Sequence, residues 1–485
     1  MLFNSHIFML LFLPLLLAGW YFLNWKKKFQ LAQGYLIGMS LWFYAYANLQ
    51  YLWLLLFSCL IGWLLSCLPE KISSEKGKKV LTGVGCVFHL GLLGYFKYSN
   101  FFLENLNTVF HTDFPMLQIL LPVGISFYTF QQLAYLIDRC RGDAPRDSFF
   151  DYLTFMVYFP QLLQGPILLR SEFMEQLKEP ERRRFHAERF SEGIQFFVFG
   201  LAKKVLLADT LAKAVNYGYS NVSMLDSISA LLLAVGYLTE LYFDFSGYCD
   251  MAVGLGKMIG LEVAENFDAP FHSASVKEFW RRWHMTLGRF FTRYVYIPLG
   301  GNRRGKMRTL CNVMIVMLLS GLWHGAAWTF VLWGFLHGVG MIWDNLEHPH
   351  LPKKWMRQAA TFAYVCMTFV FFRAESIAQG VDVLKSIVSL KWNGFVFQMA
   401  SALDLTEFYM ITKALSMKLP GLLSWFWLGI FVVLIAICFR VLSGKKVSGV
   451  VALQKQKGYG RLYPVLLAFL FTWSMISMTG VSEYL

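Results

Sequence analysis

The sequence has few charged residues and is especially short of acidic ones. Only 15% of its 485 residues are Asp, Glu, Lys or Arg, whereas 56% are hydrophobic and the mean hydropathy is +0.47. Soluble domains carry roughly 25% charged residues, so this shortage argues against an ordinary soluble protein. Apolar stretches of about 20 residues, long enough to cross a bilayer as helices, recur along the chain. The composition therefore indicates an integral membrane protein.

The chain also lacks the patterns that mark several other protein classes. No Ser/Gly-rich linker, low-complexity tract or fixed-period repeat divides it, so we expect one membrane domain over residues 1–485. The eight cysteines are scattered and form no C-x-x-C pair, which indicates neither a metal site nor a disulfide framework. H-E-x-x-H, G-x-S-x-G and Walker A motifs are absent, so a catalytic metal or a hydrolase nucleophile has no support.

What the chain does contain is a series of apolar runs that are candidate transmembrane helices. They are residues 5–24, 32–48, 50–67, 80–98, 117–137, 193–208, 226–243, 309–322, 326–343, 356–372, 424–440 and 462–480. We therefore expect an all-α polytopic membrane protein with about 11–12 transmembrane helices.

The positive charges are placed as membrane orientation requires. The net charge of +14 does not favour nucleic-acid binding, because basic loops beside membrane spans follow from the positive-inside rule and from anionic lipids. We expect the basic loops 70–79, 139–146 and 445–461 in the cytoplasm. The first apolar run precedes the lysines at 26–28, the reverse of a cleavable signal, so we expect a retained first helix with its amino terminus outside.

Residues 149–169 form an apolar segment that proline and glutamine interrupt. Pro160 and Pro166 lie within it, beside Gln161 and Gln164. Such a segment predicts a broken or re-entrant path, which is tolerated at membrane depth only where the backbone is buried in protein or lines a wet cavity.

Residues 267–308 combine aromatic rings with nine Lys or Arg residues. The segment is too charged to cross lipid and predicts a helix in the cytoplasmic interface, with its rings at the boundary. Ser275 and Glu278 fit a capping box, so we expect the helix to begin near Val276. Three- and four-residue spacing would place Trp280, Trp283, His284 and Leu287 on one face.

His324 is the first candidate for chemistry. It lies in S-G-L-W-H-G-A-A-W, residues 320–328, inside an apolar run where an ionisable group is costly and usually functional. The small residues around it let a second helix or a substrate approach the ring, and a neutral imidazole there could act as a general base toward a hydroxyl. The alternative is a histidine that only ties two helices together.

Other polar residues leave more alternatives open. His284 could be functional or could contact only headgroups or solvent. His337 falls about 220° around an ideal helix from His324, which favours packing or an interhelical hydrogen bond. Asp244 and Asp250 could line a polar cavity or form a structural ion pair and a helix cap. The basic turn at 299–306 could present amides and guanidinium groups to phosphate.

An ordered set of motifs resembles the membrane-bound O-acyltransferase family, most closely its bacterial branch of polysaccharide O-acetyltransferases that includes the alginate enzymes. The matching stretches are LPVGISFYTF (121–130), YFDFSGYCDMAVGLG (242–256), FWRRWHMTLGRFFTRYVYIPLGGNRRG (279–305), SGLWHGAAWTFVLWGFLHG (320–338) and FFRAE (371–375).

The resemblance implies a ring of transmembrane helices, with re-entrant and interfacial helices, around a central cavity in the cytoplasmic membrane. It implies that His324 and His284 are catalytic, and that the basic segment and turn face a thioester donor. With it we take as substrate-binding candidates Trp323, Ser320, Trp280, Arg281, Asp250 and Gln161.

The implied reaction moves an acetyl group from acetyl-coenzyme A or an acyl carrier protein to a polysaccharide hydroxyl outside the cytoplasm. Transfer would be direct or through a periplasmic SGNH-type partner, with no tightly bound cofactor. Transfer of D-alanine or another acyl group to a cell-envelope polymer is the nearest alternative. A transporter or flippase, with His324 and the two aspartates on a proton or substrate path, and a scaffold for periplasmic enzymes are further readings.

Overall fold

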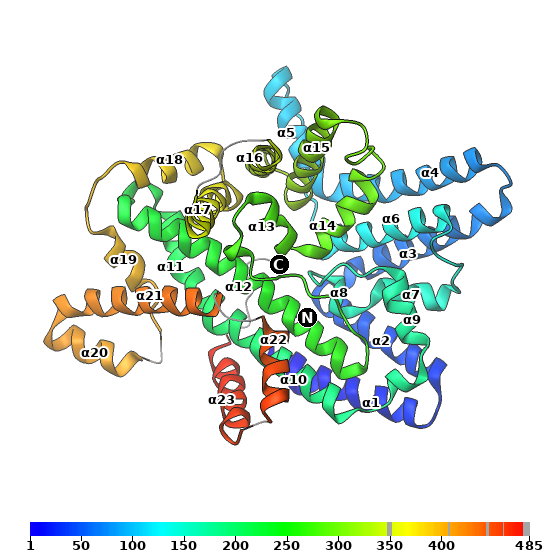
Figure 1. Cartoon of the computed structure of the whole chain (residues 1–485), viewed down its shortest axis with the longest axis horizontal. Coiled ribbons are helices and arrows are strands. Elements are labelled where there is room, and N and C mark those ends of the chain that lie inside the picture. The colour runs from blue at the N-terminus through cyan, green and yellow to red at the C-terminus, as the bar shows by residue number, and fades with distance from the viewer. Residues whose placement is uncertain (347–351, 406–407, 443–445, 459, 479–485) are drawn as a thin grey trace.

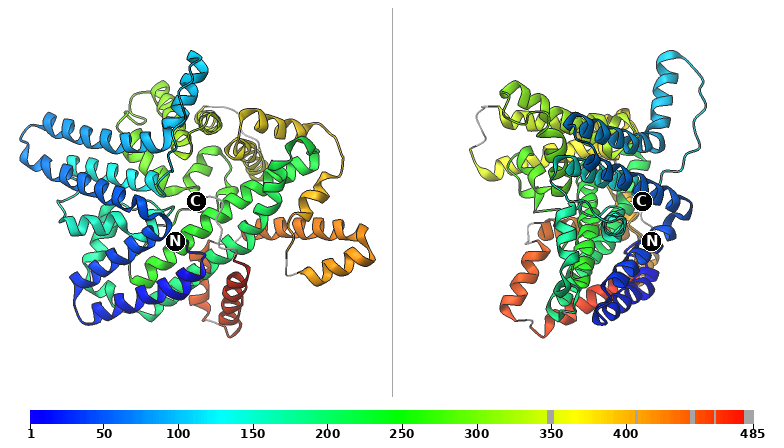
Figure 2. Two further views of the ribbon diagram at one scale, coloured as in Figure 1. Left: turned by 180° about the vertical axis from the view of Figure 1, so that it is seen from behind. Right: turned by 90° about the vertical axis from the view of Figure 1, so that its right-hand side faces the viewer.

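A computed structural model describes residues 1–346, 352–405, 408–442, 446–458 and 460–478 (Figure 1). Throughout these ranges the regular secondary structure is helical, which confirms the all-α prediction. Figure 1 shows α12 (Ser227–Ile259) crossing the middle of the molecule with the other helices arranged around it. Both views in Figure 2 show α5 (Ser99–Phe110) projecting from the body.

The amino-terminal helices form one side of this arrangement. They are η1 (Phe8–Phe12), α1 (Leu13–Trp25), α2 (Phe29–Asn48), η2 (Leu49–Tyr51), α3 (Leu52–Cys67), η3 (Leu68–Lys71), α4 (Glu75–Leu93), η4 (Gly94–Tyr98), α6 (Ile125–Arg141), α7 (Phe149–Val157), α8 (Phe159–Leu162) and α9 (Arg170–Lys178).

The central helices contain most of the motif residues. Besides α12 they are η5 (Pro180–Arg183), α10 (Ala187–Ala202), η6 (Lys203–Ala208), α11 (Asp209–Ser220), η7 (Val222–Met224), η8 (Pro270–His272), α13 (Val276–Arg282), α14 (Met285–Phe291), η9 (Thr292–Tyr296), α15 (Lys306–His324), α16 (Trp328–Asn345) and α17 (Lys354–Arg373). The carboxyl-terminal helices are α18 (Ile377–Val388), α19 (Phe395–Ser401), α20 (Tyr409–Lys418), α21 (Pro420–Leu442), α22 (Val447–Lys457) and α23 (Leu462–Ser477).

The chain is a multi-pass membrane protein. Among the described residues, six helical stretches are long and apolar enough to cross a membrane: Phe8–Trp25, Leu49–Glu70, Glu75–Phe110, Ser227–Ile259, Lys306–His324 and Pro420–Val441. The other predicted spans also contain helices, which are shorter or more polar, with one correction at 117–137. There the chain forms no helix up to Pro122, and α6 begins after Gly124, whose φ of 77° favours glycine.

The predicted span 226–243 is also too short, because α12 continues to Ile259. Its continuation carries Asp244 and Asp250 through the protein interior. Lys204 forms an ion pair with Asp244, and the Lys203 ammonium lies 2.6 Å from Asp250. Each carboxylate is thus paired inside the fold, so the helix has no need to end where the apolar run ends.

The interruption predicted within residues 149–169 is confirmed. Helix α7 ends at Val157, α8 lasts only to Leu162, and the chain then runs without a helix to Leu169. Most of this stretch is buried, so its backbone groups need partners within the protein. One of them is met by the Thr286 hydroxyl, which accepts a hydrogen bond from the Ile167 amide at 3.1 Å.

The single helix expected from Val276 is wrong. The Ser275 cap is present, but α13 ends at Arg282, Trp283 is extended, and His284 has a φ of 46° before α14 starts. The expected shared face of Trp280, Trp283, His284 and Leu287 therefore does not exist. Five rings of the segment face protein instead of headgroups, because Phe279, Trp283, Phe290, Phe291 and Tyr294 are buried in the protein core.

Helices α15 and α16 form a tight hairpin that displays His324 at its turn. The Cα atoms of Gly321 and Gly334 face each other, since a Cβ built on either glycine would lie 3.3 Å from the other's Cα. A Cβ on Gly334 would also lie 2.4 Å from the Met317 carbonyl oxygen. Small residues at this crossing therefore allow the two backbones to touch.

We predict that Gly334→Ala destabilises the protein by about 1–3 kcal/mol, because the added methyl group forces the two helices apart. The measurement is thermal unfolding in detergent. Gly429→Ala in α21 is the matched control, since no heavy atom lies within 4 Å of a Cβ built there, and it should unfold at or slightly above the wild-type temperature. Equal unfolding temperatures for the two variants would show that the hairpin is looser than described.

Candidate functional site

A cavity of about 320 Å³ lies where α6, α12, α15, α16 and α17 meet the break between α13 and α14. We call it the histidine cavity. It is lined by Lys97, Ser126, Phe127, Gln164, Leu241, Asp244, Phe245, Trp283, His284, Trp323, His324, Phe330, Trp333, Phe369 and Phe372. Aromatic rings form most of its wall, so the polar groups that face it are few and concentrated.

His324 occupies the last position of α15 and faces the histidine cavity. Its ring centroid lies 5.2 Å from that of Trp333 and 5.1 Å from that of Phe372, both approached edge to face. Within the described part of the chain, no hydrogen bond to a protein group occupies either ring nitrogen. The imidazole is half-buried, held by rings rather than by polar partners, and open to a ligand.

His284 faces the same cavity from the break between α13 and α14. Its ring centroid lies 6.4 Å from that of His324, although the two residues are 40 positions apart in the sequence. Its side chain is 1% exposed, which overturns the alternative of contact with headgroups or solvent. Burial lowers the pKa of His284 to about 3, so the imidazole is neutral near pH 7.

Asn266 fixes the proton of this neutral ring. The Asn266 side-chain oxygen lies 3.2 Å from His284 Nδ1 and accepts hydrogen bonds from the Thr286 amide at 3.0 Å and hydroxyl at 2.9 Å. An amide N–H can only donate, so this atom is an acceptor and His284 Nδ1 must carry the proton. The other nitrogen, Nε2, then holds a lone pair, and it has no partner among the described residues.

Lys97 is the polar residue of the histidine cavity that sequence reasoning missed. It lies in η4, and its ammonium donates to the carbonyls of Trp323 and His324 and to the Ser126 hydroxyl. The Tyr98 hydroxyl adds a bond to the Leu322 carbonyl at 2.5 Å. Together these groups satisfy the free carbonyls at the end of α15. A lysine inside the predicted span 80–98 was the available signal.

The predicted substrate-binding residues divide into two groups. Trp323 lines the histidine cavity, stacked on Phe130. Ser320 and Gln161 are buried but do not line it. Trp280 donates to His337, and Arg281 is an exposed side chain on the outer face of α13, so neither lines the cavity.

The two aspartates of α12 lie in the walls of different cavities. Asp244 lines the histidine cavity while paired with Lys204. Asp250 lies further along the helix, in the wall of a second cavity that does not include either histidine. Each aspartate therefore both lines a cavity and forms an ion pair, but the helix cap expected with the ion pair is wrong, because both residues lie inside α12.

His337 forms the interhelical hydrogen bond expected for it. It accepts from Trp280 Nε1 at 3.2 Å and bonds the Thr368 hydroxyl at 2.9 Å. The helical-wheel angle behind that expectation is wrong, because His324 ends α15 whereas His337 belongs to α16. The Trp333 ring lies between the two imidazoles.

Comparison with known proteins agrees with the resemblance in the motifs. The model of the MBOAT, membrane-bound O-acyltransferase family matches residues 141–379. A peptidoglycan O-acetyltransferase of Helicobacter pylori is 35% identical over 423 residues, which cover 80% of each chain. A probable alginate O-acetylase of Azotobacter vinelandii is 39% identical over 78% of this chain and 76% of its own. A teichoic acid D-alanyltransferase of Streptococcus thermophilus is 28% identical over 49% of this chain and 58% of its own.

We predict that Asn266→Ala destabilises the protein by about 1–3 kcal/mol, because it leaves the buried donors of His284 and Thr286 without their acceptor. Chemical or thermal unfolding in detergent measures the change. Asn302→Ala, in the exposed turn before α15, is the control and should unfold like the wild type. If Asn266→Ala were as stable as that control, the three bonds to Asn266 would not hold the break between α13 and α14.

Proposed function

The chain belongs to the membrane-bound O-acyltransferase family, and on that premise we propose that it moves an acetyl group from a cytoplasmic thioester to a polysaccharide hydroxyl outside the cytoplasm. The observation that carries the proposal is the pair of histidines from distant segments that share one cavity. The peptidoglycan and alginate substrates in the names of two relatives support a polysaccharide acceptor. The donor we propose is acetyl-coenzyme A or an acetylated carrier protein.

In the proposed reaction His324 acts as the general base. A ring nitrogen takes the proton of the acceptor hydroxyl as its oxygen attacks the thioester carbonyl. The tetrahedral intermediate collapses with loss of the thiolate, which receives the proton from the His324 imidazolium. The Lys97 ammonium, which lines the same cavity, supplies positive charge for the oxyanion.

His284 fits a positioning role toward the donor. Its Nε2 lone pair is buried at the cavity wall while Nδ1 is committed to Asn266. An N–H or O–H group of a bound substrate would satisfy that lone pair, and the amide groups of a pantetheine arm are donors of this kind. Binding of the correct substrate thereby completes the hydrogen bonding of a group that is otherwise unpaired.

The basic turn at 299–306 supports a donor site on this side of the protein, where it would bind the phosphates of coenzyme A or the acidic surface of a carrier protein. Arg303 and Arg304 are exposed beside three glycines with positive φ, at 300, 301 and 305. We propose that the protein lies in the cytoplasmic membrane, with this face in the cytoplasm and the amino terminus outside, as the positive-inside rule favours. A periplasmic SGNH-type partner that relays the acetyl group is compatible with the same arrangement.

We predict that His324→Ala lowers acetylation of the cell-surface polymer by roughly 10²–10⁴-fold, the contribution typical of general base catalysis. The acyl group released from the polymer is measured by mass spectrometry at equal protein abundance. His337→Gln is the matched control, because it is also buried near Trp333 but lies outside the cavity, and it should retain most of the activity. Normal acetylation in His324→Ala would favour a scaffold, and release of D-alanine by the wild type would change the acyl group proposed.

A second substitution tests the cation of the site. Lys97→Met should lower the same transfer by roughly 10²-fold, because the oxyanion loses its charge partner and the end of α15 loses its cap. Lys79→Met, an identical exchange on the exposed surface of α4, is expected to leave transfer unchanged. Equal rates for the two methionine variants would remove Lys97 from the mechanism.

A further inference from the structure

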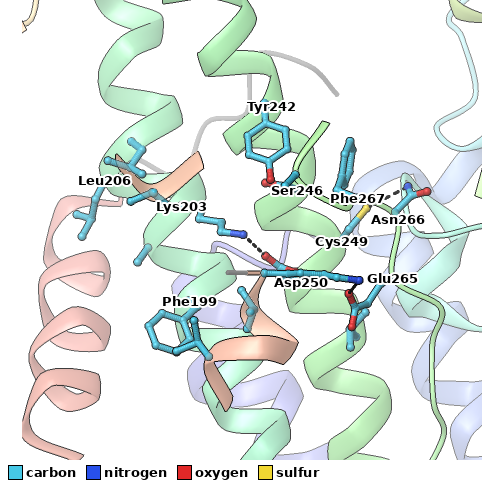
Figure 3. A pocket seen from close by; sticks show the side chains of 18 of the residues that line it. Phe199, Lys203, Leu206, Tyr242, Ser246, Cys249, Asp250, Glu265, Asn266 and Phe267 are labelled. Carbon is cyan, nitrogen blue, oxygen red and sulfur yellow. Dashed lines mark hydrogen bonds and ion pairs between the residues drawn. The ribbon is translucent and has the colours of Figure 1, made fainter. Parts of the chain in front are cut away.

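A second cavity, of about 440 Å³, lies between α10, α12, α21, α22 and α23 (Figure 3). We call it the α22 cavity. Its walls are mostly apolar: Phe199, Ala202, Leu206, Leu207, Val253, Phe267, Ala269, Ile437, Val441, Val447, Val450 and Leu470. Its volume is within the range of roughly 300–1,000 Å³ that small-molecule sites occupy. An apolar ligand of substantial size fits there.

The charged groups inside the α22 cavity are already paired. Figure 3 shows the Lys203 and Asp250 side chains pointing toward each other, with 2.6 Å between their charged atoms. Both side chains are mostly buried. A neutralised pair of this kind offers no net charge to the deep part of a ligand, so hydrocarbon suits this end of the cavity.

The exposed rim has a different character. The Lys446 ammonium lies 3.5 Å from a Glu265 carboxylate oxygen and 3.5 Å from one of Asp268. All three side chains are between 31% and 43% exposed. Lys446 and Glu265 line the cavity, whereas Asp268 is not part of its lining. The rim therefore presents an ammonium and a carboxylate side by side, which are partners for the phosphate and the ammonium of a zwitterionic headgroup.

Two of the helices that line the α22 cavity also face the bilayer. Helix α21 is a candidate membrane span and α23 is a shorter apolar helix. Their other faces carry exposed Val432, Val433, Leu466 and Phe469. Apolar faces of this kind stand in lipid in a membrane protein, so lipid chains pack on the far side of the helices that line the cavity.

From these observations we propose that the α22 cavity binds an ethanolamine phospholipid. One acyl chain fills the apolar interior beside the Lys203–Asp250 pair. The ammonium of the headgroup pairs with Glu265, and its phosphate contacts Lys446. The site is distinct from the histidine cavity and does not depend on the acetyl transfer proposed above.

One residue connects the two cavities. Asn266 lines the α22 cavity together with Cys249, and its amide nitrogen lies 3.4 Å from the Cys249 sulfur. The oxygen of the same amide accepts the hydrogen bond from His284 Nδ1, and His284 lines the histidine cavity. A lipid chain in the α22 cavity therefore packs against the back of the residue that holds His284.

The test uses the full-length protein in bilayer nanodiscs with a phosphatidylethanolamine whose acyl chain carries a photoreactive diazirine. After irradiation, we expect mass spectrometry to locate labels on the inward residues of α22 and α23, such as Val450 and Leu470. Val450→Trp fills the cavity and should lower this labelling roughly tenfold. The control is Ala452→Trp on the exposed side of the same helix, which should label as the wild type does.

Four results would overturn the proposal. One is labelling confined to the outer faces of α21 and α23. Another is equal cavity labelling in Val450→Trp and Ala452→Trp, with Leu470→Trp as a second variant should Val450→Trp fail to fold. The third is competition by acetyl-coenzyme A, which would assign the cavity to the thioester donor. An anionic phosphatidylglycerol probe should label less than the ethanolamine probe, and equal labelling would contradict the headgroup assignment.

Discussion

The structure depends on one constraint: an interrupted helix away from water must satisfy its free backbone groups within the protein. Three interruptions meet near the histidine cavity, and each is satisfied locally. Lys97 and Tyr98 bind the last carbonyls of α15. The Asn266 carbonyl and side-chain oxygens accept the first amides of α14, from Met285 and Thr286. The Thr286 hydroxyl then accepts the Ile167 amide of the third interruption.

This requirement explains why both histidines stand at helix ends. A residue in the middle of a helix presents its ring sideways, whereas His284 and His324 lie where the helical path stops and the chain turns. Two of the groups that close these ends also belong to the site, because Lys97 lines the cavity and Asn266 bonds His284. The same side chains therefore stabilise the fold and shape the site, and a substitution at one of them changes both properties.

Local patterns predicted the features that local chemistry determines. The prolines and glutamines at 149–169 predicted the interrupted segment. The break at His284 was not predictable, because no glycine or proline marks it and its hydrogen-bond acceptor, Asn266, lies 18 residues earlier. The pairing of His284 with His324 followed from the family resemblance, not from spacing. Lys97 was overlooked because its carbonyl partners are more than 220 positions away. Sequence also does not show that Arg281 points outward or that Asp250 lines a cavity apart from the histidines.

The shared wall at Asn266 has a thermodynamic consequence. When one side chain lines one cavity and bonds a histidine of the other, any shift in its preferred position changes the free energy of binding on both sides. Linkage makes such an effect reciprocal: an occupant of the α22 cavity that tightens binding beside His284 is itself bound more tightly, by the same factor, when the histidine cavity is filled. The membrane composition and the substrate would then act on this protein as mutual effectors.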